Sequence, residues 1–175
     1  MIYFEMDSKE ADVISNILSD LKEENAKKIV QRASKRAAVT ARKAGTKKIR
    51  EVYNVKNVAV IHSRVKFSQI DDGINIIVRG PYEPVTKYKA SKRKKGVFVS
   101  IKKDSGDIID RSYTLNGQYK MRKEKRGRLP VKNIYGPAVP QLFQNKQVEA
   151  EMEKEGIEMY EKRLWHELDR ILGGK

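Results

Sequence analysis

The sequence predicts an α+β fold: a long basic N-terminal helix, a central antiparallel β-sheet with basic loops, and a C-terminal amphipathic helix. Two long stretches, over residues 24–53 and 141–172, repeat apolar residues at helical spacing. Between them, short apolar runs alternate with turn signals such as Asp71-Asp72-Gly73, which is typical of antiparallel strands. The length of 175 residues suits one domain, so we expect residues 1–175 to form a single domain.

Residues 1–23 are expected to hold a short strand and a short helix. Ile2–Met6 is rich in residues that favour strands. Over residues 9–22, apolar residues recur every three or four positions after the polar pair Asp7-Ser8, which predicts an amphipathic helix.

The helix predicted over residues 24–53 combines a basic face with an alanine stripe. Residues 27–50 carry ten basic and no acidic side chains. The apolar positions are mostly alanine, which lets a neighbouring backbone approach closely but buries little area. We therefore expect this helix to depend on a sheet or on another subunit for its stability.

The middle of the chain changes to the period of strands. Val58–Ile61 and Val65–Ile70 are short apolar runs, and a hairpin is expected around Asp71-Asp72-Gly73, with its second strand over residues 74–79. Further strands are predicted over residues 85–90, 97–101 and 108–115.

Residues 91–128 form a basic hairpin and loop region with thirteen basic and four acidic side chains. Lys92–Lys95 is expected at a turn or on a loop that projects from a hairpin. Lys120–Arg128 has no apolar period, which predicts a loop.

Leu129-Pro130-Val131 is expected to be extended, and the prolines of residues 135–140 predict a rigid connector that is neither a regular helix nor a central strand.

The sequence offers no constellation that would support catalysis. It contains no cysteine, which excludes thiol catalysis, thiolate zinc sites and iron–sulfur clusters. His62 and His166 lie far apart without a recognisable catalytic or metal-binding motif, so a structural role is favoured for each. We expect no enzymatic activity, no cofactor, no metal and no small-molecule substrate.

No apolar run is long enough to span a membrane, and the first residues do not resemble a signal peptide.

The formal net charge of +15 indicates a polyanionic or acidic partner. Basic blocks attract DNA or RNA without reading its sequence. The same blocks are also compatible with an acidic protein neighbour or with a solvated lysine-rich face. The basic blocks are not interleaved with aromatic residues, apart from Tyr113 and Tyr119, and no helix-turn-helix or zinc-finger pattern is present, which disfavours base-specific recognition.

Segments over about residues 25–170 together resemble the minor tail protein Z family of long-tailed phages and prophages. The most specific stretch is Leu129-Pro130-Val131 followed by Tyr135-Gly136-Pro137-Ala138-Val139-Pro140-Gln141. The other segments, in chain order, are Ile49–Lys56, Tyr88-Lys89-Ala90, Lys95–Val99 and Lys162–Leu168. Ser105–Lys120 departs from the family, which has a more glycine-rich and less charged segment there.

The resemblance implies a structural tail completion protein at the neck, where the tail meets the head. It implies a homo-oligomeric ring, expected to be a hexamer, that helps head–tail joining and positions the genome end in the channel. The implied partners are tail terminator proteins, head-completion or connector proteins, and phage DNA. The implied location is the virion, with the host cytoplasm during assembly. A free cytoplasmic nucleic-acid-binding factor without base specificity is the alternative.

We expect two sets of site residues. The set expected to contact DNA or an acidic partner comprises Lys92, Arg93, Lys94, Lys95, Lys120, Arg122, Lys123, Lys125, Arg126 and Arg128. The set expected at the subunit or partner interface comprises Leu129, Pro130, Val131, Tyr135, Gly136, Pro137, Val139, Pro140 and Phe143.

Overall fold

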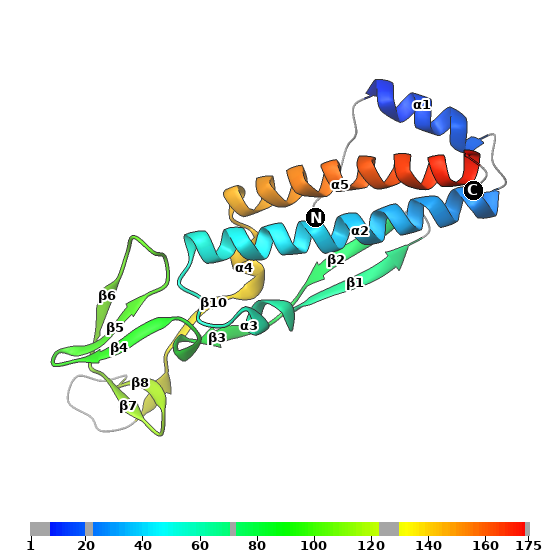
Figure 1. Cartoon of the computed structure of the whole chain (residues 1–175). Helices are drawn as coiled ribbons and strands as arrows, with labels where there is room; N and C mark the ends of the chain where they lie inside the picture. Colours follow the sequence, from blue (N-terminus) through cyan, green and yellow to red (C-terminus); the bar gives the residue numbers. More distant parts are fainter. Residues whose placement is uncertain (1–7, 20–22, 71–72, 123–129, 174–175) are drawn as a thin grey trace. The chain divides into compact units, whose positions relative to one another are not determined.

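The computed structural model describes residues 8–19, 23–70, 73–122 and 130–173. These residues form helices and small antiparallel sheets (Figure 1), which confirms the α+β class. They group into two compact units. The first unit contains residues 8–19, 23–45, 65–70, 73–77 and 146–173, and the second unit contains residues 46–64, 78–122 and 130–145. The strand expected at Ile2–Met6 lies outside the described residues.

The first unit is built mainly from helices. It contains α1 (Ser8–Ser19), the first 23 residues of α2 (Glu23–Val52), the strand β1 (Val65–Ile70), the strand β2 (Gly73–Val78) except its last residue, and α5 (Lys146–Leu172). Within this unit, α2 lies between α5 and the β1–β2 hairpin (Figure 1). The helix expected over residues 24–53 and the hairpin around Asp71-Asp72-Gly73 are thus confirmed.

Local charge explains where α2 begins. Glu23 and Glu24 occupy its first turn, where carboxylates interact favourably with the helix dipole. Each pairs with the lysine four residues later, at 2.7 Å to Lys27 and 2.5 Å to Lys28. Hydrogen bonds from these lysines lower the pKa of both carboxyl groups below the ordinary value.

The core of the first unit joins α1, α2 and α5. Its buried side chains are Ile14, Ile29, Ala33, Leu164 and Leu168. Along α2 the alanines at 33, 37, 38 and 41 are at most 3% exposed, which confirms that the alanine stripe is closely packed. The hairpin approaches the same helix, since a Cβ at Gly73 would lie 3.8 Å from Ser34 Oγ and the guanidinium of Arg42 lies 5.2 Å from the centre of the Phe67 ring.

The second unit contains short strands and short helices. In chain order they are α3 (Val58–His62), β3 (Tyr82–Pro84), the 3-10 helix η1 (Val85–Lys87), β4 (Lys89–Arg93), β5 (Gly96–Ser100), β6 (Asp107–Asp110), β7 (Ser112–Leu115), β8 (Gln118–Arg122), β9 (Val131–Asn133), β10 (Tyr135–Ala138) and α4 (Val139–Phe143). The strands pair antiparallel as β4–β5–β6, β7–β8–β9 and β10–β3. The described strands therefore form several small sheets where the sequence predicts one central sheet.

Several local predictions are wrong in this unit. The strand expected over residues 85–90 begins only at Lys89, because residues 85–87 form η1. The strand expected over residues 108–115 is interrupted at Arg111, whose φ of 56° breaks it into β6 and β7. Lys120–Arg122 is not a loop but the end of β8, where each residue pairs with β9.

The prolines after residue 135 also act differently from the prediction. Residues 135–138 form the strand β10, which pairs with β3 alone, so its Pro137 needs no second partner strand. Pro140 lies in the first turn of α4, where a missing N–H breaks no helical bond. The helix expected over residues 141–172 is divided in two: α4 ends at Phe143 and α5 begins at Lys146.

Tyr88 lies at the centre of the second unit. Its side chain is 1% exposed, and its hydroxyl donates a hydrogen bond of 2.7 Å to the carbonyl oxygen of Pro137. Burial, followed by the nearby charge of Glu83, raises the pKa of Tyr88 to about 12. The other buried apolar side chains of this unit are Ile49, Tyr53, Ile61, Val85, Val97, Ile134, Ala138, Val139, Leu142 and Phe143.

Candidate functional site

The β4–β5 turn carries the first predicted basic cluster. Lys92 and Arg93 end β4, Lys94 and Lys95 form the turn, and all four side chains are exposed. Within the described part of the chain, no carboxylate forms an ion pair with any of them. The hairpin therefore presents four adjacent cationic side chains to solvent.

Gly96 fixes the geometry of this turn. Its φ of +152° is one that residues with side chains rarely adopt, and an added Cβ would lie 2.3 Å from the carbonyl oxygen of Ile109. Next to it, the backbone N–H of Val97 donates to Ser112 Oγ at 2.7 Å. The cations are thus held on a defined hairpin, and the Arg93 guanidinium lies 6.0 Å from the centre of the Phe98 ring.

The second predicted basic cluster is only partly described. Lys120 is half-buried and pairs with Tyr113 across β7 and β8, whereas Arg122 is exposed and lies 5.7 Å from the centre of the Tyr113 ring. The other members, Lys123, Lys125, Arg126 and Arg128, lie outside the described residues.

The residues expected at the subunit interface differ strongly in exposure. Gly136, Val139 and Phe143 are buried inside the second unit, and Leu129 lies outside the described residues. Val131, Pro137 and Pro140 are half-buried, while Pro130 and Tyr135 are exposed. The buried members pack within the subunit, so only the exposed members and, in part, the half-buried members are accessible to a partner.

Two tyrosines lie on the outer face of the β3–β10 sheet. Tyr82 is 60% exposed and Tyr135 is 54% exposed. Tyr135 is paired with Pro84, which lies two residues after Tyr82 and on the same face of β3. Between them, Glu83 faces inward and accepts a 2.9 Å hydrogen bond from Arg64 Nε. The sheet therefore has a polar anchor on one face and two exposed aromatic rings on the other.

A group of arginines around Glu167 was not singled out by the sequence analysis. The Glu167 carboxylate is 6% exposed and forms ion pairs with Arg32 at 3.2 Å, Arg170 at 2.9 Å and Arg163 at 3.9 Å. An open hollow of about 360 Å³ adjoins it, which we call the basic hollow. Its lining residues are Arg32, Lys35, Arg36, Val39, Arg163 and Glu167.

This group depends on contacts between distant segments. Arg163 and Arg170 flank Glu167 at helical spacing on α5, so their proximity to Glu167 can be read from the local sequence. Arg32 belongs to α2 and precedes Glu167 by 135 residues in the sequence. Only the packing of α2 against α5 brings the two basic segments together. The acid-free stretch over residues 27–50 is the sequence signal that could have drawn attention to the α2 half of this surface.

Neither histidine is part of a metal-binding group. His62 and His166 are both exposed. In the described segments, no three acidic, histidine or cysteine side chains come close enough to hold a metal ion. Of the helices that the structure describes, none has the length and apolar character needed to cross a bilayer.

Comparison of the chain with protein-family models, with characterised proteins and with solved structures finds no match. The resemblance noted in the sequence therefore has its support in the quoted segments alone.

Proposed function

We propose that the chain is a structural subunit of a tail completion ring at the neck of a long-tailed phage or prophage particle. The observation that carries the proposal is the exposed pair Tyr82 and Tyr135 on the β3–β10 sheet. Tyr135 belongs to the segment that most specifically resembles the minor tail protein Z family. Exposed tyrosines on the surface of a sheet are typical of contacts between proteins.

The distribution of charge agrees with this proposal. Cations on the β4–β5 hairpin and on α2 would face the DNA in the channel, or an acidic neck protein, without reading bases. A ring subunit also needs surfaces that meet the same neighbours in every copy. Tyr82 and Tyr135 would provide part of such a surface, with tail terminator and head-completion or connector proteins at the two ends of the ring.

The test replaces both tyrosines with serine in the phage or prophage that encodes the chain. Because both rings are largely exposed, the Tyr82→Ser, Tyr135→Ser variant should fold with little loss of stability. We expect it to be depleted from purified particles and to leave heads and tails unjoined in electron micrographs. Leu115→Ser is the matched control, since Leu115 is 42% exposed on another sheet, and it should assemble normally. Normal particles from the tyrosine variant would contradict the proposal.

The alternative is a free cytoplasmic nucleic-acid-binding factor without base specificity. The exposed cations at Lys92–Lys95 favour it, because they need no assembled ring to attract a polyanion. This alternative predicts that the protein is absent from intact particles and that the tyrosine substitutions have no effect on assembly.

A further inference from the structure

We propose that the basic hollow between α2 and α5 binds a phosphate group of a nucleic-acid backbone. The inference rests on the proposed function for the source of the phosphate, the DNA of the neck channel. It assigns the contact to α2 and α5, in addition to the hairpin and loop residues expected from the sequence.

The charge balance in the basic hollow favours an anion. Arg32, Lys35, Arg36 and Arg163 line it, and the Glu167 carboxylate beside them already pairs with three arginines. Since the cations outnumber this single carboxylate, the hollow keeps an excess of positive charge. Lys35 and Arg36 are exposed and form no ion pair with any carboxylate that the structure describes.

Glu167 also makes the arrangement rigid. Its carboxylate holds Arg32 from α2 and Arg163 from α5, so guanidinium groups from both helices are oriented before any ligand arrives. The Nε–H of Arg163 is buried and has no acceptor among the described residues. Guanidinium groups present planar sets of donors that match phosphate oxygens. An oxyanion in the hollow would therefore meet donors that the protein itself leaves partly unused.

A nucleic acid fits this surface better than an acidic protein does. Among the lining residues that the structure describes, Val39 is the one apolar side chain, and none is aromatic. Protein interfaces usually have an apolar or aromatic centre, whereas phosphate contacts are made mainly by arginine and lysine.

The experiment measures binding of the full-length protein to a short DNA duplex of arbitrary sequence, by fluorescence anisotropy over a range of salt concentrations. We expect Lys35→Gln, Arg36→Gln to weaken binding about tenfold at about 0.1 M salt. We also expect the slope of the logarithm of the association constant against the logarithm of salt concentration to fall in magnitude by about 2, because two phosphate contacts are lost.

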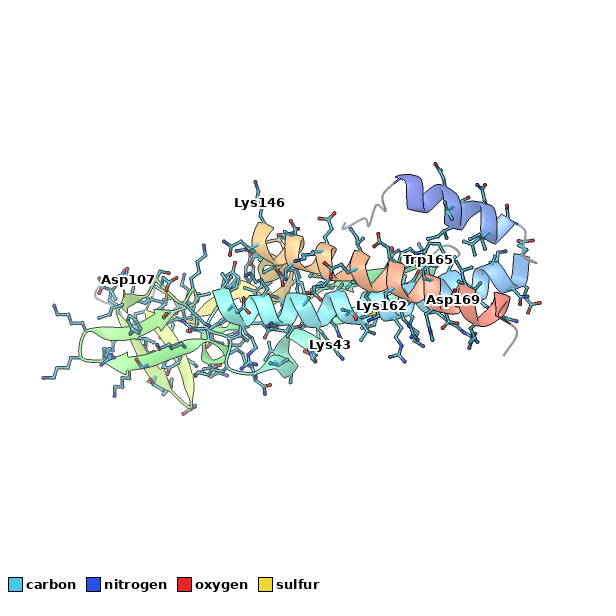
Figure 2. The ribbon with its side chains drawn as sticks, turned by 45° about the horizontal axis from the view of Figure 1, so that its top comes forward. Lys43, Asp107, Lys146, Lys162, Trp165 and Asp169 are labelled. Atoms are coloured by element: carbon cyan, nitrogen blue, oxygen red, sulfur yellow. The ribbon has the colours of Figure 1, made fainter. Side chains whose placement is uncertain are left out.

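A matched control removes the same charge elsewhere. Lys43 and Lys162 are exposed on α2 and α5 and do not line the hollow (Figure 2). The Lys43→Gln, Lys162→Gln variant should therefore change affinity much less than the Lys35, Arg36 variant. Equal losses from the two double variants would overturn the proposal, because they would indicate attraction to the overall charge and no local site.

Competition with pyrophosphate distinguishes the source of the phosphate. We expect pyrophosphate to displace the duplex from the wild-type protein and to bind the Lys35, Arg36 variant more weakly. Binding of pyrophosphate without binding of the duplex would overturn the proposal in favour of a small phosphate compound. Duplex binding at the hollow by a protein that is absent from particles would leave the site intact and overturn the tail completion function instead.

Discussion

The burial of Tyr88 in the second unit changes the pKa of its hydroxyl group. Its ring is buried, its hydroxyl donates to the Pro137 carbonyl oxygen, and its pKa is raised to about 12. In the unfolded chain the pKa of tyrosine is about 10. Below pH 10 the phenol is protonated in both states, so its contribution to stability is fully present there.

The pH dependence of stability should report this difference. Between pH 10 and pH 12 the unfolded chain loses the Tyr88 proton while the folded protein keeps it, so the free energy of unfolding falls as the pH rises. For the full shift in pKa the loss is about 3 kcal/mol. Urea unfolding of the wild type and of Tyr88→Phe, at pH 8 and at pH 11.5, measures it. The stability advantage of the wild type should shrink or reverse at pH 11.5, and an advantage that does not change with pH would contradict the account.

For individual residues, the sequence could predict which residue types contribute to a binding surface, but not which of them lie close together in the fold. The net charge and the acid-free stretch of α2 indicated a polyanion, and exposed lysines at the β4–β5 turn were expected from their sequence. The basic hollow was not predictable, because Arg32 and Arg163 approach each other only through helix packing. The burial of Val139 and Phe143 was not predictable either, since apolar residues in a proline-rich segment can pack in the core of the subunit or at an interface with a partner.

The elements differ in how well their sequences encode them. The helices α1, α2 and α5 were predictable because a period of about 3.6 persists through each of them. The strands were harder to delimit, since runs of four or five residues contain too few positions to define a period. Asn116-Gly117, which the sequence analysis did not consider, is a strong signal for a two-residue hairpin turn. Both residues have positive φ and connect β7 to β8.

The strand β10 depends on a glycine that allows close approach. A Cβ at Gly136 would lie 2.7 Å and 2.9 Å from two ring atoms of Tyr88. Because that ring is buried, it cannot move away, and we expect Gly136→Ala to destabilise the protein by about 1–3 kcal/mol. Urea denaturation measures this change.

Gly73→Ala is the control for that substitution. A Cβ at Gly73 would come no closer than 3.8 Å to a neighbouring atom, which is ordinary contact, and alanine also reduces the entropy of the unfolded chain. Its effect on the free energy of unfolding should therefore be within about 1 kcal/mol. Equal stability losses for Gly136→Ala and Gly73→Ala would show that the approach of β10 to Tyr88 is not tight.

At the scale of the whole molecule, the chain separates into two compact units whose sequences interleave. This division was not predictable from the sequence, because α2 is one continuous helix that contributes residues to both units. The single domain expected over residues 1–175 remains a prediction. The fold class was predictable because it requires only the types and order of the elements.

The contacts that we propose are spread over both units. The exposed tyrosines and the β4–β5 cations belong to the second unit, and the basic hollow belongs to the first. The tyrosine contact and the contact at the basic hollow can therefore be tested separately. A tyrosine variant should keep its affinity for the duplex, and a Lys35, Arg36 variant should keep its ability to enter particles.

The copy number of the chain in purified, nuclease-treated particles tests the proposed ring most directly. Quantitative mass spectrometry, normalised to the portal protein, provides the number. We predict a small and fixed copy number, because a closed ring contains a set number of subunits. Absence of the chain from intact particles would contradict the ring and leave the free nucleic-acid-binding factor as the better account.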